Sequence, residues 1–129
     1  ASELENVLLI GNPGIDFLRA PHEHKIWDLG AAWKELSDLP FVYAVWALRR
    51  GCHDETLRNK LLRAKENGIN HLSEIIATHS DYDADFRQAY LGGHIRYNLG
   101  AREKAGLNKF IELLGTHGNQ PVFKPVIVK

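Results

Sequence analysis

The sequence predicts an α/β fold in which short buried strands alternate with amphipathic helices. Apolar runs at residues 7–10 and 41–48 show no polar alternation, which is typical of strands covered on both faces. Other stretches repeat apolar residues at helical spacing, as residues 101–114 do. With 44% hydrophobic and 25% charged residues, the 129-residue chain has the composition of one globular unit.

The chain is predicted to start with a strand, a turn and a short helix. Residues 7–10, Val-Leu-Leu-Ile, form an apolar run of strand length, and Gly-Asn-Pro-Gly at 11–14 predicts a turn after it. A short helix is expected over 15–19. Pro21 ends this helix, because the residue before a proline is displaced from the helical region.

A second strand and helix precede the main predicted strand. Residues 25–29 suit a strand, and residues 30–36 contain good helix formers with Trp33 and Leu36 on one face. The sequence Ser-Asp-Leu-Pro ends this helix. Residues 41–48 are rich in aromatic and β-branched side chains, so we expect them to form the central strand.

The second half of the chain is predicted to be mainly helical. Residues 54–79 form one helix, or two joined at Gly68, with Asp54 as the N-cap. A helix over 80–91 follows and ends at a glycine pair. The remaining expected elements are a possible short strand, a helix with one apolar stripe and an extended tail: 95–97, 101–114 and 122–128.

Charge and composition exclude several classes of partner. Sixteen basic residues balance sixteen acidic ones, so no long-range field draws the chain to nucleic acid or to an anionic membrane. Cys52 is the single cysteine, which fits a reducing compartment. No apolar run approaches the roughly 20 residues of a membrane helix, and the N-terminal residues lack the basic region of a secretory signal. We therefore expect a cytoplasmic protein.

Gly11 and Asn12 form the first candidate binding site, in the turn between a predicted strand and a predicted helix. Open α/β sheets place ligand-contacting loops at this position, where free backbone N–H groups can bind a carboxylate. Asn and Gly are also standard turn residues, so a plain turn is the alternative interpretation.

Phe41 and Tyr43 form the second candidate. They alternate along the predicted central strand, so their side chains share one face and can line a cleft. Core packing is the alternative, and it is the commoner fate of a residue such as Phe41. The tyrosine hydroxyl needs a partner if it is buried. The tryptophans are expected to be core anchors: Trp27, Trp33 and Trp46.

Two pairs of neighbouring polar residues are interpreted as surface or packing residues. His22 and His24 have no third metal ligand nearby, so they are expected to lie on the surface. Cys52 and His53 are adjacent, and adjacent side chains of an extended chain point to opposite sides. They are therefore not expected to form a nucleophile and its base.

Neither a calcium loop nor another metal site is expected. An acidic cluster resembles the start of a calcium loop, but it lacks the glycine at the sixth position and the glutamate at the twelfth. The cluster consists of Asp81, Asp83 and Asp85, and helix capping explains it better. Arg49 and Arg50 follow the central strand and could lend positive charge to an anionic site, although solvated positions are commoner for such residues.

Three pieces of sequence, in order, are LLIGN at 8–12, WDLGAAWKE at 27–35 and LPFVYAVWA at 39–47. They resemble the chorismate dehydratase family of menaquinone biosynthesis, whose members usually read LIGD, DLG-x-x-W-x-E and LPFVFAVWA at these places. A weaker similarity to the last helix of the family follows at residues 97–110. Asn12 stands where the family usually has an acid.

The resemblance covers about the C-terminal half of the family, and it implies part of a two-lobed, periplasmic-binding-protein-like (type II) fold. Residues 1–39 would be a remnant of the second lobe, and residues 40–129 the C-terminal part of the first. Substrate would lie between the lobes, where the resemblance implies contacts from a small set of residues: Gly11, Asn12, Phe41 and Tyr43. The catalytic residues of this chain are unknown, because those of the family lie largely in the other half.

The activity implied is that of a lyase dehydrating chorismate, a dicarboxylate, to 3-[(1-carboxyvinyl)oxy]benzoate. Aromatisation drives this reaction, so it requires neither a metal nor an organic cofactor in principle. A complementary N-terminal half, or a second copy of the chain, is the expected protein partner. Two alternatives are a non-catalytic module that binds a small carboxylate and a fragment that associates with itself.

Overall fold

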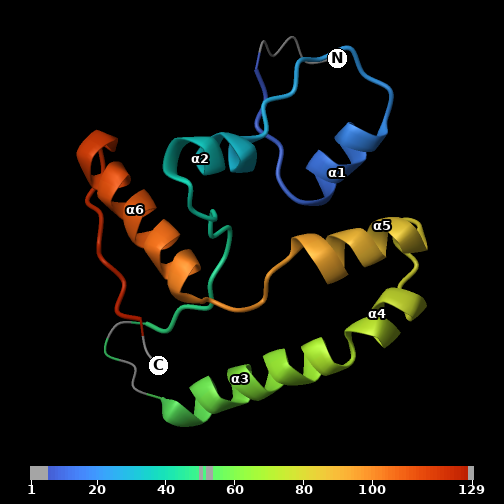
Figure 1. Ribbon diagram of the computed structural model, residues 1–129. Helices are drawn as coiled ribbons and strands as arrows, with labels where there is room; N and C mark the ends of the chain where they lie inside the picture. Colours follow the sequence, from blue (N-terminus) through green and yellow to red (C-terminus); the bar gives the residue numbers. More distant parts are fainter. Residues whose placement is uncertain (1–5, 50, 52–53, 128–129) are drawn as a thin grey trace.

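The computed structural model describes residues 6–49, 51 and 54–127, and Figure 1 shows their helices spread out rather than stacked in layers. Every regular element in these residues is helical. Six are α-helices and one is a π-helix: α1 (Asn12–Arg19), α2 (Leu29–Ser37), α3 (Glu55–Asn70), α4 (Leu72–Thr78), α5 (Ala84–Ala89), η1 (Tyr90–His94) and α6 (Ala101–His117).

Helices form where they were predicted, because local signals determine where most of them begin. The helix expected over 80–91 begins only at Ala84, and the glycine pair at 92–93 lies inside η1 rather than ending it. Aspartate side chains cap three of the helices. Asp28 accepts hydrogen bonds from the N–H groups of the first turn of α2, Asp54 accepts one from Leu57 at 2.9 Å, and Asp83 accepts one from Phe86 at 2.8 Å. A side-chain oxygen at the N-cap satisfies N–H groups that lack a partner in the helix.

The break in the long predicted helix lies at a different residue from the one expected. Gly68 lies inside α3, and the chain changes direction at His71, whose backbone has left the helical region. The Nδ1 atom of His71 lies 2.8 Å from the carbonyl oxygen of Asn67, four residues earlier. A side chain that bonds a carbonyl group in the last turn can end a helix without glycine.

The prediction of strands at 7–10, 25–29, 41–48 and 95–97 is wrong for the described residues. These segments carry no helix or strand, except that Leu29 begins α2. A strand needs a neighbour to pair its N–H and C=O groups. Residues 7–10 and 41–48 lie in separate parts of the ribbon, so neither pairs with the other (Figure 1). The sheet of the predicted α/β fold is therefore absent from this part of the chain.

The chain exposes far more surface than a closed globule of its size. Its accessible surface is 11158 Å², whereas a folded monomer of 14.6 kDa exposes about 6900 Å². Among the described hydrophobic residues, Trp33 and Ile76 alone are buried. The predicted core anchors Trp27 and Trp46 are instead 77% and 65% exposed. No described helix is long and apolar enough to cross a membrane.

An aromatic cluster, formed by Trp33, Phe41 and Phe110, joins α2 to α6. Its rings meet edge to face, with centroids 5.1 to 5.7 Å apart, a favourable arrangement for aromatic pairs. Beside it, the backbone of α6 at Gly106 approaches the carbonyl group of Pro40. The short segment that follows α2, at Pro40 and Phe41, is thereby held against both helices.

A polar clasp, formed by Asp16, Arg19, Tyr82 and Asp83, joins α1 to the start of α5. Arg19 forms an ion pair with Asp83, and the Tyr82 hydroxyl donates to Asp16 at 2.8 Å. The Arg19 guanidinium also lies 4.8 Å from the centre of the Phe86 ring. Because α1 contains no buried residue, these surface contacts are its main attachment to the second half of the chain.

Candidate functional site

The turn at Gly11 and Asn12 has the predicted position but few free N–H groups. Gly11 has a φ of 67°, which favours glycine, and precedes α1 as its N-cap. Its carbonyl oxygen accepts hydrogen bonds from Gly14 at 3.0 Å and Ile15 at 3.1 Å. Pro13 has no N–H group. Both Gly11 and Asn12 are exposed, so a carboxylate here would meet the Asn12 side chain and the N–H groups of these two residues.

Phe41 and Tyr43 contact each other but differ in their surroundings. Their ring centroids lie 4.9 Å apart at a steep angle. Phe41 is part-buried in the aromatic cluster, as core packing requires, whereas Tyr43 is 67% exposed. Among the described residues, no hydrogen bond or ring contact joins this pair to Gly11 or Asn12. The structure therefore brings together two of the four predicted site residues.

Tyr43 also lies over the first turn of α2, a contact that the sequence analysis did not find. A Cβ atom placed on Gly30 would overlap the Tyr43 hydroxyl. Partial burial raises the pKa of the Tyr43 phenol, and the negative charge of Asp28 raises this pKa further. The phenol therefore stays protonated at neutral pH. A glycine in the first turn of a helix was the available signal, since such a glycine often has a packing reason.

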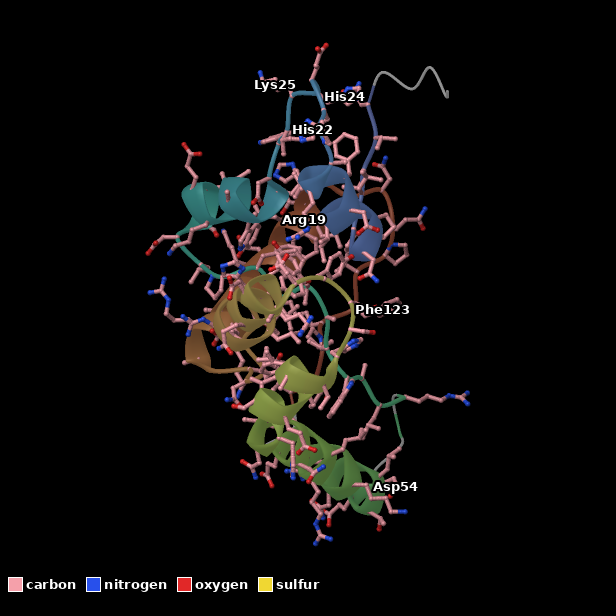
Figure 2. The ribbon with its side chains drawn as sticks, turned by 90° about the vertical axis from the view of Figure 1, so that its right-hand side faces the viewer. Arg19, His22, His24, Lys25, Asp54 and Phe123 are labelled. Atoms are coloured by element: carbon pink, nitrogen blue, oxygen red, sulfur yellow. The ribbon has the colours of Figure 1, made fainter. Side chains whose placement is uncertain are left out.

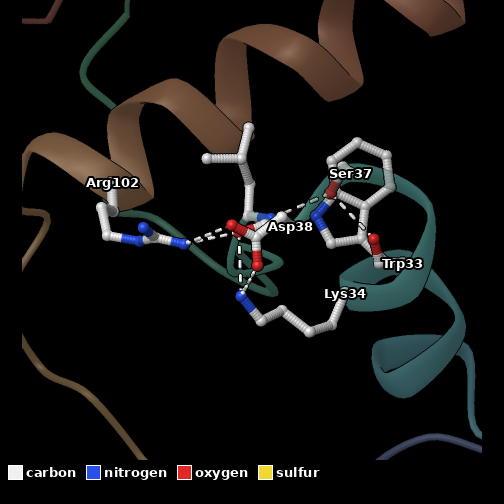
Figure 3. Close-up of polar contacts among 6 residues, drawn as sticks. Trp33, Lys34, Ser37, Asp38 and Arg102 are labelled. Atoms are coloured by element: carbon white, nitrogen blue, oxygen red, sulfur yellow. Dashed lines mark hydrogen bonds and ion pairs between the residues drawn. The ribbon is translucent and has the colours of Figure 1, made fainter.

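The chain that leaves α2 is fixed by a polar node at Asp38 (Figure 3). Asp38 has a φ of 54°, in the left-handed region. Lys34 and Arg102 both donate to its carbonyl oxygen and both form ion pairs with its carboxylate. Lys34 and Arg102 lower the pKa of Asp38, and Lys34 has the larger effect.

Ser37 continues the node toward the aromatic cluster. Its hydroxyl donates to the Trp33 carbonyl oxygen at 2.8 Å and accepts from the Leu39 N–H at 3.2 Å. The Trp33 indole N–H is buried without a hydrogen-bond partner among the described residues. Residues 39–41 are thus held in one geometry by contacts with α2 and α6.

The geometry around the other described candidates supports no catalytic or metal-binding role. His22 and His24 stack with Phe17 on an exposed loop at one end of the molecule, opposite Asp54 (Figure 2). Within the described residues, no three His, Cys, Asp or Glu side chains gather to hold a metal ion. Asp83 caps α5, and Arg49 is exposed. Three candidates lie outside the described residues: Arg50, Cys52 and His53.

Two open hollows occur on the described surface, and neither contains a predicted site residue. One of about 350 Å³ lies between Leu114 and the C-terminal segment 118–123. The other, of about 380 Å³, lies between Ile69 and segment 95–98 at the start of α6. The second has mixed charge, since both Arg96 and Glu103 line it. Neither geometry selects a particular ligand.

Comparison with known proteins identifies the family. Residues 1–116 match the family model described as menaquinone biosynthesis. The chain belongs to this family. Over 133 aligned residues it is 32% identical to the chorismate dehydratase of Thermus thermophilus, so the resemblance to chorismate dehydratase is confirmed.

The alignment covers 88% of this chain and 49% of that relative, so the chain spans about half the length of the enzyme it matches. No solved structure matches the chain significantly. The family is therefore established by sequence.

Proposed function

We propose that this chain forms the C-terminal half of a cytoplasmic chorismate dehydratase. In the proposed reaction, chorismate loses water to give 3-[(1-carboxyvinyl)oxy]benzoate. The observation that carries the proposal is the 32% identity with a chorismate dehydratase over 88% of the chain. The family model, which covers residues 1–116, supports it independently of that one relative.

The chemistry requires positioning, removal of a proton and protonation of the leaving group. A base accepts a proton from a ring carbon, the C–O bond to the hydroxyl group breaks, and the ring becomes aromatic, while the departing hydroxide takes up a proton and leaves as water. Holding the dianionic substrate in one orientation lowers the entropic part of the barrier. We assign the orienting contacts of this half to Tyr43 and Phe41, and to the turn at Gly11 and Asn12. We assign the catalytic base to the half of the family enzyme that this chain does not cover.

The large exposed surface supports a requirement for that other half. The chain exposes about 4000 Å² more than a closed protein of its mass. Obligate interfaces bury from about 2000 to more than 5000 Å² in total, so an excess of this size is enough for one. In the proposed complete enzyme, residues 7–10 and residues 41–48 lie in different lobes of a two-lobed α/β fold, and each pairs with a strand of the other half.

A complementation assay tests this proposal. The chain is incubated with chorismate, alone and with the N-terminal half of the Thermus thermophilus relative, and loss of water is followed by mass spectrometry. We expect turnover in the mixture and none with either half alone. Absence of turnover in the mixture, despite formation of a complex, would contradict the enzyme proposal.

A non-catalytic module that binds a small carboxylate is the second candidate. Asn12 favours it, because the replacement removes the acidic side chain usual in the family, and with it the role of that acid, from the candidate binding turn. Calorimetric titration with chorismate distinguishes the two. Binding without turnover in the complementation assay would support the module, and turnover would exclude it.

Self-association is the third candidate, favoured by the same exposed apolar surface. Sedimentation at several concentrations tests it. Dimers or larger species that form without the N-terminal half would support this candidate. A monomer at every concentration would contradict it.

A further inference from the structure

We propose that Gly30 is a positioning residue that holds the Tyr43 hydroxyl over the start of α2, where this hydroxyl donates a hydrogen bond to the carboxylate-bearing ligand. The proposal rests on the proposed function for the identity of the ligand. The contact joins two of the sequence pieces that resemble the family, WDLGAAWKE with Gly30 and LPFVYAVWA with Tyr43. The family usually has Phe at position 43, so the hydroxyl is a feature of this chain.

The geometry shows why glycine is needed at this position. A Cβ on Gly30 would overlap the Tyr43 hydroxyl oxygen and would contact the Asp28 carboxylate at 3.2 Å. Gly30 has no left-handed backbone conformation to explain its presence. In a helix, alanine is favoured over glycine. In this chain, the close approach of the Tyr43 hydroxyl leaves space only for glycine at this position.

The hydroxyl held there is available as a donor. Asp28 already accepts hydrogen bonds from Gly30 at 2.8 Å and Ala31 at 3.0 Å. Tyr43 donates to no group among the described residues, in contrast to Tyr82 and Tyr97, which have oxygen partners. Because the ring is 67% exposed, an incoming ligand can reach the hydroxyl without rearrangement of the core.

Replacement of Gly30 should move Tyr43 rather than unfold the chain. The atom that a new Cβ would meet is the end of an exposed side chain, which can rotate away at little cost. Gly30→Ala therefore separates the position of the hydroxyl from the stability of the fold. Removing the hydroxyl in Tyr43→Phe relieves the overlap, so the double variant is expected to keep the ring in place.

The first measurement uses no ligand. The chain is labelled with ¹³C-tyrosine, and the Tyr43 signal is assigned by its loss in Tyr43→Phe. Burial, Asp28 and Tyr90 raise the pKa of the Tyr43 phenol above 10 in the unsubstituted chain. In Gly30→Ala we expect this pKa to fall toward 10 and the signal to shift at pH 7. Gly68→Ala, where a Cβ meets nothing within 4 Å, is the control.

The second measurement is titration with chorismate, with the chain alone and in complex with the N-terminal half. A hydrogen bond to a charged group contributes about 1.5–3 kcal/mol, so we expect roughly 10-fold to 150-fold weaker binding in Gly30→Ala and in Tyr43→Phe. The double variant should bind no more weakly than Tyr43→Phe, because both changes remove the same contact.

The outcomes separate this inference from the proposed function. An unchanged Tyr43 signal and pKa in Gly30→Ala would overturn the positioning role. A displaced Tyr43 with undiminished chorismate binding would overturn the donor role. If the unsubstituted chain binds no chorismate in either format, the ligand role fails together with the proposed function, while the NMR result still decides whether Gly30 positions Tyr43.

Discussion

Gly106 of α6 lies against the carbonyl oxygen of Pro40, with no space for a Cβ atom between the two backbones. Gly106 is buried. Phe41, which follows Pro40, packs against Phe110, which lies four residues after Gly106 in α6. Unlike the Tyr43 hydroxyl beside Gly30, a backbone carbonyl cannot rotate away on its own. Substitution at Gly106 must therefore displace the whole of α6 or the segment after α2.

The first prediction is that Gly106→Ala destabilises the chain by about 1–3 kcal/mol, the usual cost of overpacking. Alanine is the better helix former, so its propensity opposes this loss. The free energy of unfolding is measured by urea denaturation with circular dichroism. Gly68→Ala in α3 is the matched control, because its new Cβ enters open space. It should stabilise by about 0.5–1 kcal/mol. Equal effects of the two substitutions would refute the close contact.

The second prediction concerns the charge of Asp38. Asn tolerates the left-handed backbone, so Asp38→Asn removes the ion pairs with Lys34 and Arg102 but keeps the turn. We expect the urea midpoint to fall at pH 7, and to fall less in 1 M salt, because the residues are exposed and their attraction is screened. Glu35→Gln on the same helix, which has no ion pair among the described residues, is the control.

The pH dependence of this effect has a defined sign. The folded chain lowers the pKa of Asp38 below 3.8, so the contribution is fully present above pH 3.8. It is lost as the pH falls through the lowered value and Asp38 gains a proton. The midpoints of the unsubstituted chain and Asp38→Asn should therefore converge at acid pH. A difference that persists there would mean that the ion pairs are not its source.

The helices were predictable because their signals are local. Asp54 and Asp83 are N-caps that act on the next turn, and Pro21 acts on the residue before it. The strands were not predictable in the same way. A run such as 41–48 has the composition of a strand, but its N–H and C=O groups need a neighbour that sequence pattern does not supply. In the described residues no such neighbour is present.

The candidate site was predictable to a similar extent. Alternation along the chain predicted that Phe41 and Tyr43 share one face, and their rings are in contact although the segment is not a strand. The approach of Tyr43 to Gly30 depends on how the chain turns at Asp38 and Pro40. That turn is held by Arg102, far away in sequence, so no local pattern could predict it. The roles of Gly11 and Asn12 in binding stay predictions.

The third prediction is that Arg19→Met releases α1 from α5. The methionine keeps much of the apolar side chain but loses the ion pair with Asp83 and the contact with the Phe86 ring. We expect faster amide hydrogen exchange across Asn12–Arg19, since α1 has no buried residue to hold it. Arg63→Met on α3 should leave this exchange unchanged, because Arg63 has no ion pair among the described residues. Unchanged protection of α1 in Arg19→Met would show that the clasp does not hold this helix.

The fourth prediction tests whether the exposed segment 41–48 is the surface that the other half covers. Trp46 is 65% exposed here, and burial of a large side chain at an interface contributes about 2 kcal/mol. Trp46→Lys should therefore weaken association with the N-terminal half of the relative by roughly 30-fold, measured by calorimetry. It should leave the helix content of the isolated chain unchanged, because Trp46 does not lie in a helix.

Val126→Lys is the matched control for this experiment. Val126 is 85% exposed and lies beyond residues 1–116, the part that matches the family. Its replacement adds the same charge to the chain but should not alter association. If both substitutions weaken association equally, net charge rather than burial of segment 41–48 explains the effect. If neither does, the other half binds elsewhere, and the proposed pairing of this segment as a strand is wrong.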